Sequence, residues 1–426
     1  MKMMMMSKNS TSFLPGKTLA LSALMAVVPV GTADAQDEVL PAVSADGTSI
    51  RLNRNDPSFD MWKRVRSDLS KGREAGPINV QRFEGGFPWI GIPTFFHLPV
   101  ALTPEDLKAG KVEVAIMGAE LVGDMRARTW GPMEMRNPHR SEVYHLWGSF
   151  AMPELDSGLN PLQELTVVDY GDAPMEPLSL EKTIVEVRKY VRDIASVEIG
   201  EGKRTIPVII GGGHALMYPD VAGLADVYGK KKIGIIHFDA HFDSSAIGFG
   251  HVVTHGNPIR ALVNEGIVDP KAIVQVGLRG PTSNDLDGIK WVRDQGIRYH
   301  MMEEINQKGW DKVIDEAIKE AKEAAEYLFI SFDVDVVDPA FIPGTSTPEP
   351  GGMTMREALP ICRRLCAEAN VIGIELVELR PDSDPGYTTM LNAKALLRQM
   401  LNGLAMRKKG LTQDNYVHPW MLDDGN

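Results

Sequence analysis

The sequence predicts an α/β fold, a three-layer α/β/α sandwich around a central, mostly parallel sheet. Short apolar segments typical of strands alternate with helical segments from about residue 110 to about residue 406. Several strand segments are apolar on both faces, as parallel strands are when helices cover both sides of their sheet. Because no linker interrupts the alternation, one domain accounts for this part of the 426-residue chain.

Six segments carry the strand pattern, with Val and Ile at many consecutive positions. In chain order they are VEVAIMG (112–118), IPVII (206–210), KIGIIHFD (232–239), AIVQVGLR (272–279), YLFISFDVD (327–335) and VIGIELVEL (371–379).

Four other segments repeat apolar residues every three or four positions, as amphipathic helices do. They span 180–196, 310–326, 354–369 and 388–406. Thr354 and Glu357 form a capping-box pair at the start of the third segment. Cys362 and Cys366 lie four residues apart in the same segment, which does not suit a disulfide, so we expect both to pack in the core.

The charge balance excludes one class of partner. The net charge is -12, whereas a nucleic-acid-binding surface needs a basic face. An acidic protein suits a cationic small substrate, although many soluble proteins are acidic without a functional reason. We therefore expect no nucleic-acid partner.

The first 35 residues have the three-part pattern of a secretory signal peptide. Lys2, Lys8 and Lys17 precede the apolar run of TLALSALMAVVPV, and ADA at 33–35 offers a small-residue cleavage site. A mitochondrial transit peptide is the alternative, but the chain has no Arg before Arg51. We expect cleavage near Ala35 and a secreted or periplasmic mature protein.

The remaining chain divides into two parts. Residues 36–90 are rich in Pro, Gly, Asp and Arg, and we interpret them as an extension that wraps the core or meets a neighbouring subunit. Residues 91–426 form the predicted main domain. No segment after the signal peptide is long and apolar enough to cross a membrane, so we expect no membrane association in the mature form.

Three predicted strands end in residues that commonly bind metals. IPVII continues into GGGH, KIGII into HFDAHFD, and YLFIS into FDVDVVDP. The carboxyl ends of parallel strands meet at one edge of the sheet, where functional groups gather. In an extended chain, residues two apart face the same way, so the alternate polar residues can converge. The six candidate ligands are His214, Asp239, His241, Asp243, Asp333 and Asp335.

Two imidazoles and four carboxylates are too many ligands for one tetrahedral zinc ion. They suit two divalent ions that share bridging carboxylates, because four negative charges balance two dications. The oxygen-rich set favours a hard ion such as Mn²⁺. A single Asp or His at such a position is more often a turn former or a core residue, but the joint pattern on three strand ends favours a metal centre. A hydroxide held between two ions is a strong nucleophile, which predicts a hydrolase.

The same motifs carry a family resemblance. GGGH, DAHFD and SFDVDVVDPAFIPGTSTPEPGG resemble the three signature blocks of the ureohydrolases, the arginase and agmatinase family. HGNPIRALVNEGIVDPKAIVQVGLRG and GIPTF are nearer to agmatinase-like members. The resemblance covers about residues 90–406 and implies an arginase-like sandwich that assembles into homo-oligomers, trimers or hexamers.

The resemblance also implies a division of roles among the ligands. It implies two Mn²⁺ ions per subunit, both of which are bound by the bridging residues Asp239 and Asp333. One ion would add His214 and Asp243, and the other would add His241 and Asp335.

Three further roles follow from the resemblance. Asp243 would also orient the hydroxide between the ions. His255, in HGNP, would pass a proton to the departing amine, and Glu378, in VELRP, would pair with the substrate guanidinium. This division suits the chemistry, because a resonance-stabilised cation needs an aimed nucleophile and a protonated leaving group.

We therefore predict a hydrolase of C–N bonds in linear amidines that converts a guanidino compound, with agmatine the first choice, to urea and an amine. Guanidinobutyrate, arginine, free guanidine and formiminoglutamate remain alternatives. Gly213 and Ala215 replace the usual Asp and Ser of the first block, and GGGH also resembles formiminoglutamase members. A secreted metal-binding protein without catalysis is another alternative, but the joint retention of all six ligands with His255 and Glu378 argues against it.

Four neighbouring features have structural interpretations. We expect the loop at 343–352 to lie near the metals, and His251 to be solvated or at the substrate entrance. His237 is expected to be a core residue. Glu375 lies three residues before Glu378, so we expect it on the opposite face of the strand in a structural salt bridge.

Overall fold

The structure is a computed structural model that describes residues 69, 71–81, 91–120, 130–137, 153–176, 179–246, 250–280 and 286–419. The chain divides into two compact units, Met1–Phe59 and Asp60–Asn426, and all described residues belong to the second. The predicted signal peptide lies outside the described residues, so export stays a prediction.

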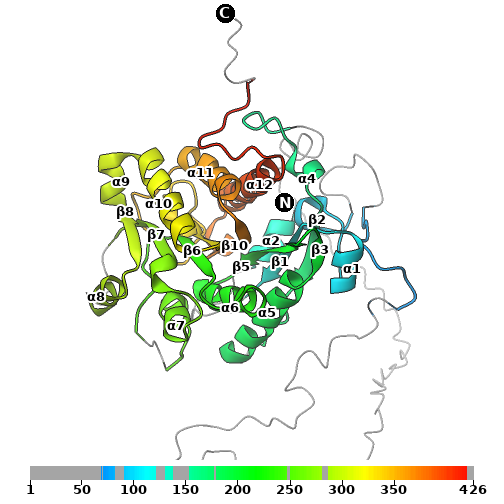
Figure 1. The fold of residues 1–426 in the computed structure, drawn as a ribbon, viewed down its shortest axis with the longest axis horizontal. Coiled ribbons are helices and arrows are strands. Elements are labelled where there is room, and N and C mark those ends of the chain that lie inside the picture. Colours follow the sequence, from blue (N-terminus) through cyan, green and yellow to red (C-terminus); the bar gives the residue numbers. More distant parts are fainter. Residues whose placement is uncertain are drawn as a thin grey trace, which may run out of the picture. The chain divides into compact units, whose positions relative to one another are not determined.

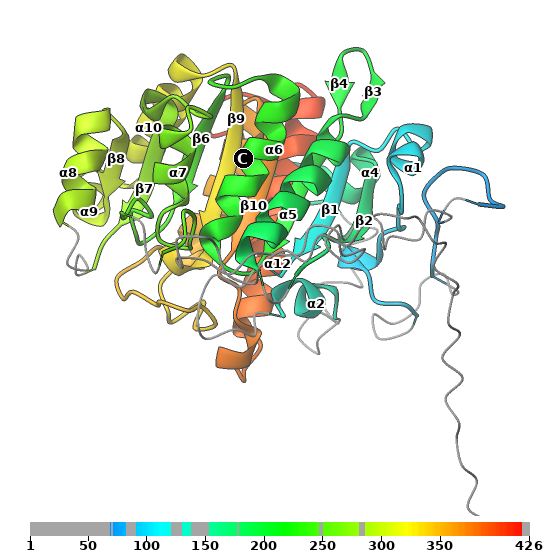
Figure 2. The same cartoon turned by 90° about the horizontal axis from the view of Figure 1, so that it is seen from below.

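A sheet of eight strands forms the centre of the second unit, and every neighbouring pair of its strands is parallel. Figure 2 shows these strands side by side. Their order across the sheet is β2 (Val167–Asp172), β1 (Val114–Ala119), β5 (Ile206–Gly211), β10 (Val371–Val377), β9 (Tyr327–Asp333), β6 (Ile233–Phe238), β7 (Ile273–Leu278) and β8 (Arg298–Met301). A two-stranded antiparallel pair, β3 (Glu198–Gly200) and β4 (Lys203–Arg204), stands apart from it.

Helices cover both faces of the sheet (Figure 1). One layer contains α2 (Gly131–Arg136), α4 (Pro161–Glu164), α9 (Met302–Lys308), α10 (Trp310–Ala324), α11 (Met355–Glu368) and α12 (Thr388–Lys408). The other contains α1 (Pro104–Ala109), α5 (Leu180–Ala195), α6 (Met217–Tyr228), α7 (Pro258–Asn264) and α8 (Leu286–Gln295). The predicted three-layer α/β/α sandwich is therefore confirmed.

The two layers follow from the alternation of side chains along each strand. In β6, Ile236 and Phe238 belong to the core on the side of α10, whereas Ile233 and Ile235 belong to the core on the side of α6. All four side chains are almost completely buried. Complete burial of an aliphatic side chain stabilises a fold by about 1.5–3 kcal/mol, so a strand that is apolar on both faces is held from both sides.

The predicted helices begin and end within a few residues of the observed ones. Thr354 and Glu357 form the predicted capping box at the start of α11. Cys362 and Cys366 are buried and free, as expected. The strand predicted over 327–335 is shorter than expected, because β9 ends at Asp333 and a 3₁₀ turn, Val334–Val336, follows.

The described part of the predicted extension packs against the main domain. Both terminal guanidinium nitrogens of Arg73 donate to the buried carboxylate of Asp106, at 2.7 and 2.6 Å. Ile78 and Val100 exchange two backbone hydrogen bonds of 2.8 and 2.9 Å. Among the described helices, none is long and apolar enough to cross a membrane.

Candidate metal centre

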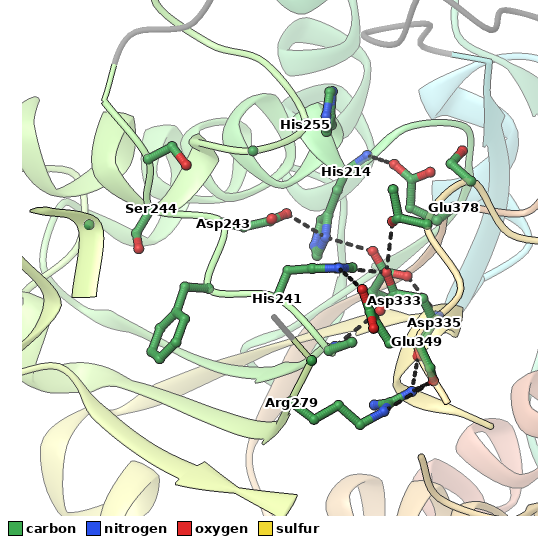
Figure 3. Close-up of a pocket in the computed structure, with 18 of the residues that line it drawn as sticks. His214, His241, Asp243, Ser244, His255, Arg279, Asp333, Asp335, Glu349 and Glu378 are labelled. Carbon is green, nitrogen blue, oxygen red and sulfur yellow. Dashed lines mark hydrogen bonds and ion pairs between the residues drawn. The ribbon is translucent and has the colours of Figure 1, made fainter. Parts of the chain in front are cut away.

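A cavity of about 510 Å³ opens at the carboxyl edge of the sheet (Figure 3). Its walls come from the ends of β5, β6, β9 and β10 and from the loop at 343–352, as predicted for that loop. The predicted site residues that line it are His214, His241, Asp243, His255, Asp333, Asp335 and Glu378. Asp239, the eighth, is completely buried and contacts both ligand histidines.

The first ligand group surrounds His214. Nδ1 of its ring lies 3.0 Å from an Oδ2 atom of each of Asp239, Asp243 and Asp333. The other ring nitrogen, Nε2, lies 2.8 Å from Oγ of Ser331. Nδ1 is buried and makes no hydrogen bond despite three nearby oxygens. An unpaired nitrogen and three carboxylate oxygens that face one space form a donor set suited to a cation.

The second ligand group surrounds His241. Nδ1 of its ring lies 2.9 Å from Oδ2 of Asp335 and 3.3 Å from Oδ1 of Asp239. Asp239 therefore contacts the first group through one oxygen and the second through the other. This is the arrangement that a bridging carboxylate needs, and the two groups together contain all six predicted ligands.

The ligands converge through tight turns, so the prediction of an extended chain at these positions is wrong. β6 ends at Phe238, and the carboxylate of Asp239 accepts the backbone N–H of His241 at 2.6 Å. Asp333 accepts the N–H of Asp335 in the same way, at 2.8 Å. Side chains of Asp commonly form such local turns, which here fold each ligand segment back over its strand end.

Two functional candidates have a left-handed backbone. The φ angles are 43° at Asp243 and 59° at Glu378, a region that residues other than Gly seldom adopt. Such strain persists where the surrounding structure holds the residue, and it is concentrated at functional sites. At Glu378, the side chain accepts the backbone N–H of His214 at 2.8 Å, which holds the carboxylate at the cavity wall.

The electrostatics of the site are dominated by buried carboxylates that lie close together. Burial and the charges of Asp335 and Asp239 raise the pKa of Asp333 well above its usual value. Burial and Asp239 raise the pKa of Asp335 to about 7. Burial tends to lower the pKa of His241, but its two aspartate neighbours outweigh burial and raise it to about 12. A divalent cation between these groups would relieve the repulsion.

Two neighbouring residues with expected structural roles also contact the site. His237 is buried, as expected, but it also contacts the site through a 2.8 Å hydrogen bond to Asp239. Glu375 is completely buried, and neither carboxylate oxygen has a hydrogen-bond partner. The expected salt bridge is present and its partner is a ligand histidine, because Oε1 of Glu375 lies 3.6 Å from Nε2 of His214. His251, which we expected to be solvated or at the entrance, is half-exposed and lies 2.7 Å from Glu181.

Arg279 is a supporting residue that the sequence analysis did not single out. Its guanidinium donates to the backbone oxygens of Asp335 and Glu349, both at 2.6 Å. It therefore ties the loop at 343–352 to the turn that carries a ligand. Ser331 of β9 supports the site in a second way, because its Oγ lies 2.8 Å from Nε2 of His214.

A third group of ligand-type residues, His300, Glu304 and Glu316, lies at the far edge of the sheet. The ammonium of Lys308 lies 2.6 Å from Glu304 and 2.7 Å from Glu316, so this group already contains a cation. It is a network of ion pairs rather than a second metal centre.

The arginase family model matches residues 113–402, which include both ligand groups. The chain belongs to the arginase family. This membership confirms the predicted reaction class, hydrolysis of C–N bonds in linear amidines. The predicted resemblance to agmatinase-like members is also confirmed, because an agmatinase is among the similar proteins.

This arginase-family chain is similar to several characterised hydrolases. It is 33% identical to guanidinopropionase from Pseudomonas aeruginosa over 320 residues, which cover 74% of this chain and 93% of the relative. It is 32% identical to the mitochondrial guanidino acid hydrolase of Homo sapiens, with 80% and 89% covered. It is also 32% identical to the mitochondrial agmatinase of Gallus gallus, with 73% and 85% covered.

The fold has similar relatives among solved structures. A hypothetical agmatinase from Burkholderia thailandensis aligns with a TM-score of 0.64 and 27% identity, over 79% of this chain and 99% of that chain. Arginase from Bacillus caldovelox aligns with a TM-score of 0.55 and 25% identity, over 68% and 98%. The arginase-like sandwich is thereby confirmed.

Proposed function

We propose that this protein is a binuclear manganese hydrolase that converts a guanidino compound and water to urea and a protonated amine. The observation that carries the proposal is the convergence of six ligand-type side chains into two groups that share Asp239. When bound, two divalent ions supply Lewis acidity and make hydroxide available at neutral pH. Four carboxylates balance their charge, and the oxygen-rich donor set favours manganese.

The residues of the chain then have separate tasks. Asp243 orients the nucleophile, because its carboxylate faces the cavity beside His214. Glu378 holds the guanidinium plane, because its buried carboxylate can pair with a planar cation. His255, which also lines the cavity, donates a proton to the departing nitrogen.

The proposal also specifies the substrate tail, the part of the molecule beyond the guanidino group. Relatives at 32–33% identity are named guanidinopropionase, guanidinobutyrase, guanidino acid hydrolase and agmatinase. The substrates in these names carry either a carboxylate or an amine at the end away from the guanidino group. Agmatine is our first choice, and the guanidino acids are the alternatives.

The first experiment measures urea release by the Mn²⁺-loaded protein from a panel of agmatine, guanidinopropionate, guanidinobutyrate, arginine and guanidine. We expect urea from at least one guanidine and two manganese ions per subunit by metal analysis. A formimino substrate in the same panel releases formamide instead of urea, which separates that alternative. A protein that binds manganese but releases product from none of these substrates contradicts the proposal.

Manganese binding should depend on pH through Asp335, whose pKa lies at about 7 without metal. Below that pH, the carboxyl group carries a proton that the metal must displace, so the apparent affinity falls as the pH falls. Above it, no proton is displaced from this group and its contribution to the pH dependence disappears. Titrations with Mn²⁺ between about pH 6 and pH 8 test this expectation. His241 keeps its proton throughout that range and adds a constant slope, so a slope that does not steepen below the pKa of Asp335 contradicts it.

A further inference from the structure

His237 is a buried imidazole next to the ligand shared by both groups. It lies in β6, two residues before Asp239, and its side chain is completely buried. Nε2 lies 2.8 Å from Oδ2 of Asp239, and Nδ1 lies 2.9 Å from the amide Nε2 of Gln275. His237 and Gln275 are direct partners in the pairing of β6 with β7. Their geometry leaves His237 with two possible roles, as a metal ligand or as a support for Asp239.

Gln275 decides between the two roles, because it determines which nitrogen of His237 carries the proton. The amide Nε2 of Gln275 also lies 2.9 Å from the backbone oxygen of Phe242, which can only accept a hydrogen bond. This atom is therefore the amide nitrogen, and one of its hydrogens is used by Phe242. The other hydrogen points at Nδ1 of His237, which must accept it. The proton of the neutral imidazole then lies on Nε2, the nitrogen that faces Asp239.

We infer that His237 and Gln275 form a positioning pair that fixes the carboxylate of Asp239 for metal binding, and that His237 is not itself a metal ligand. This inference rests on the metal centre of the proposed function. Its geometric basis is the chain of contacts from Gln275 through His237 to Asp239. Nitrogen Nε2, which is close enough to His214, Asp239 and Asp243 to join a metal site, is instead a hydrogen-bond donor.

The position of Asp239 makes this support consequential. Its Oδ2 contacts His237 and His214, while its Oδ1 contacts His241. A rotation of this one carboxylate would therefore disturb both ligand groups. Outer partners of metal ligands commonly act in this way, by holding the ligand in one orientation.

Gln275 connects the same support to the backbone of the ligand loop. Phe242, whose carbonyl oxygen it binds, lies between His241 and Asp243 in the chain. The buried amide of Gln275 therefore binds both the loop that carries His241 and Asp243 and the imidazole that binds Asp239.

A row of polar side chains across the sheet contains this pair. Pairing of β7, β6, β9 and β10 places Gln275, His237, Ser331 and Glu375 opposite one another in turn. All four are completely buried, on the face that α6 covers and where the neighbouring strand residues are apolar. Burying polar groups there is unfavourable unless they are hydrogen-bonded. His237 and Ser331 hydrogen-bond to ligand residues, and Glu375 lies 3.6 Å from Nε2 of His214, which places the row beneath the metal centre as its support.

The test is the substitution His237→Phe, which keeps a ring of similar size and removes the donor. We expect the apparent affinity for Mn²⁺ to fall about 10- to 100-fold, the usual loss when an outer partner is removed. The affinity is measured as metal content after dialysis against chelator-buffered Mn²⁺. The rise in melting temperature on adding Mn²⁺ should shrink as well. A purely packing role would lower the melting temperature of the metal-free protein and leave that rise unchanged.

His237→Gln is the conservative variant, because its amide can place an N–H where Nε2 of the imidazole lies. We expect it to recover most of the affinity. Equal losses for His237→Gln and His237→Phe would overturn the inference, since they would indicate that the imidazole itself binds the metal. Wild-type affinity in His237→Phe would overturn it too.

Further variants keep the result interpretable. Gln275→Leu removes the amide one step further from the metals, and it should weaken Mn²⁺ binding even if His237→Phe does not fold. Wild-type affinity for Mn²⁺ in Gln275→Leu would overturn the inference that His237 and Gln275 act as a positioning pair. His300→Phe removes another buried histidine, at the far edge of the sheet, and should leave the affinity unchanged. If the wild-type protein binds no Mn²⁺, the proposed function fails before the pair is tested.

Discussion

Asp333→Asn should fold normally and lose most of its manganese and its urea-forming activity. The substitution keeps the shape of the side chain, and its carbonyl oxygen can still accept the N–H of Asp335. It removes a buried charge that lies 3.0 Å from Nδ1 of His214 and is expected to bridge both ions. Breaking a buried charge pair costs about 3–5 kcal/mol, which corresponds to about 10²- to 10⁴-fold in metal affinity.

The metal-free variant gives a second, independent readout. Burial together with the charges of Asp335 and Asp239 opposes ionisation of Asp333, so its carboxylate destabilises the metal-free fold at neutral pH. We expect metal-free Asp333→Asn to melt no lower than the metal-free wild type, whereas added Mn²⁺ should stabilise only the wild type. Asp311→Asn, at an exposed position in the first turn of α10, is the matched control and should change neither property. Two manganese ions and wild-type activity in Asp333→Asn would exclude Asp333 from the centre.

The central strands could be predicted from the sequence because both of their faces are buried. β5, β6, β9 and β10 are apolar at consecutive positions, which is the pattern that identified them. β2 and β8 escaped prediction, and both lie at the edges of the sheet. Their sequences, VVDYGD and RYHM, include charged or polar residues, since an edge strand is less completely covered. The apolar signal therefore weakens where helices cover less of the sheet.

The ligand set was also predictable, but the geometry that assembles it was not. Asp and His residues at strand ends are visible in the sequence, whereas the turns formed by Asp239 and Asp333 depend on local hydrogen bonds. The left-handed backbone at Glu378 had no sequence signal either. It breaks the simple alternation along β10, so Glu375 approaches the ring of His214 while Glu378 binds its backbone N–H.

The supporting contacts depend on which strands are neighbours. Gln275 and Ser331 lie far from His237 in the sequence, but β7 and β9 lie on either side of β6. That order across the sheet differs from the order along the chain, so these contacts follow from the topology alone. The position of His237, two residues before Asp239, was the one available signal, because such residues share a face of a strand.

His255→Asn should lose activity while it keeps its metals, and this result separates an enzyme from a metal-binding protein without catalysis. His255 lines the cavity with Glu378 and belongs to neither ligand group. Removing a general acid typically lowers the rate about 10²- to 10⁴-fold. We expect a loss of this size in kcat for urea release, two manganese ions per subunit by metal analysis, and partial recovery with added imidazole.

The matched control for that variant is His251→Asn, four residues earlier. His251 lies outside the cavity lining and pairs with Glu181 at the protein surface, so its loss should leave kcat nearly unchanged. Loss of metal in His255→Asn would instead give this residue a structural role in the centre. Unchanged activity would remove it from the reaction, and the departing amine would then need another proton donor. Because the amine leaves only when it is protonated, the chemistry requires such a donor at the cavity wall, and the position of His255 there favours it.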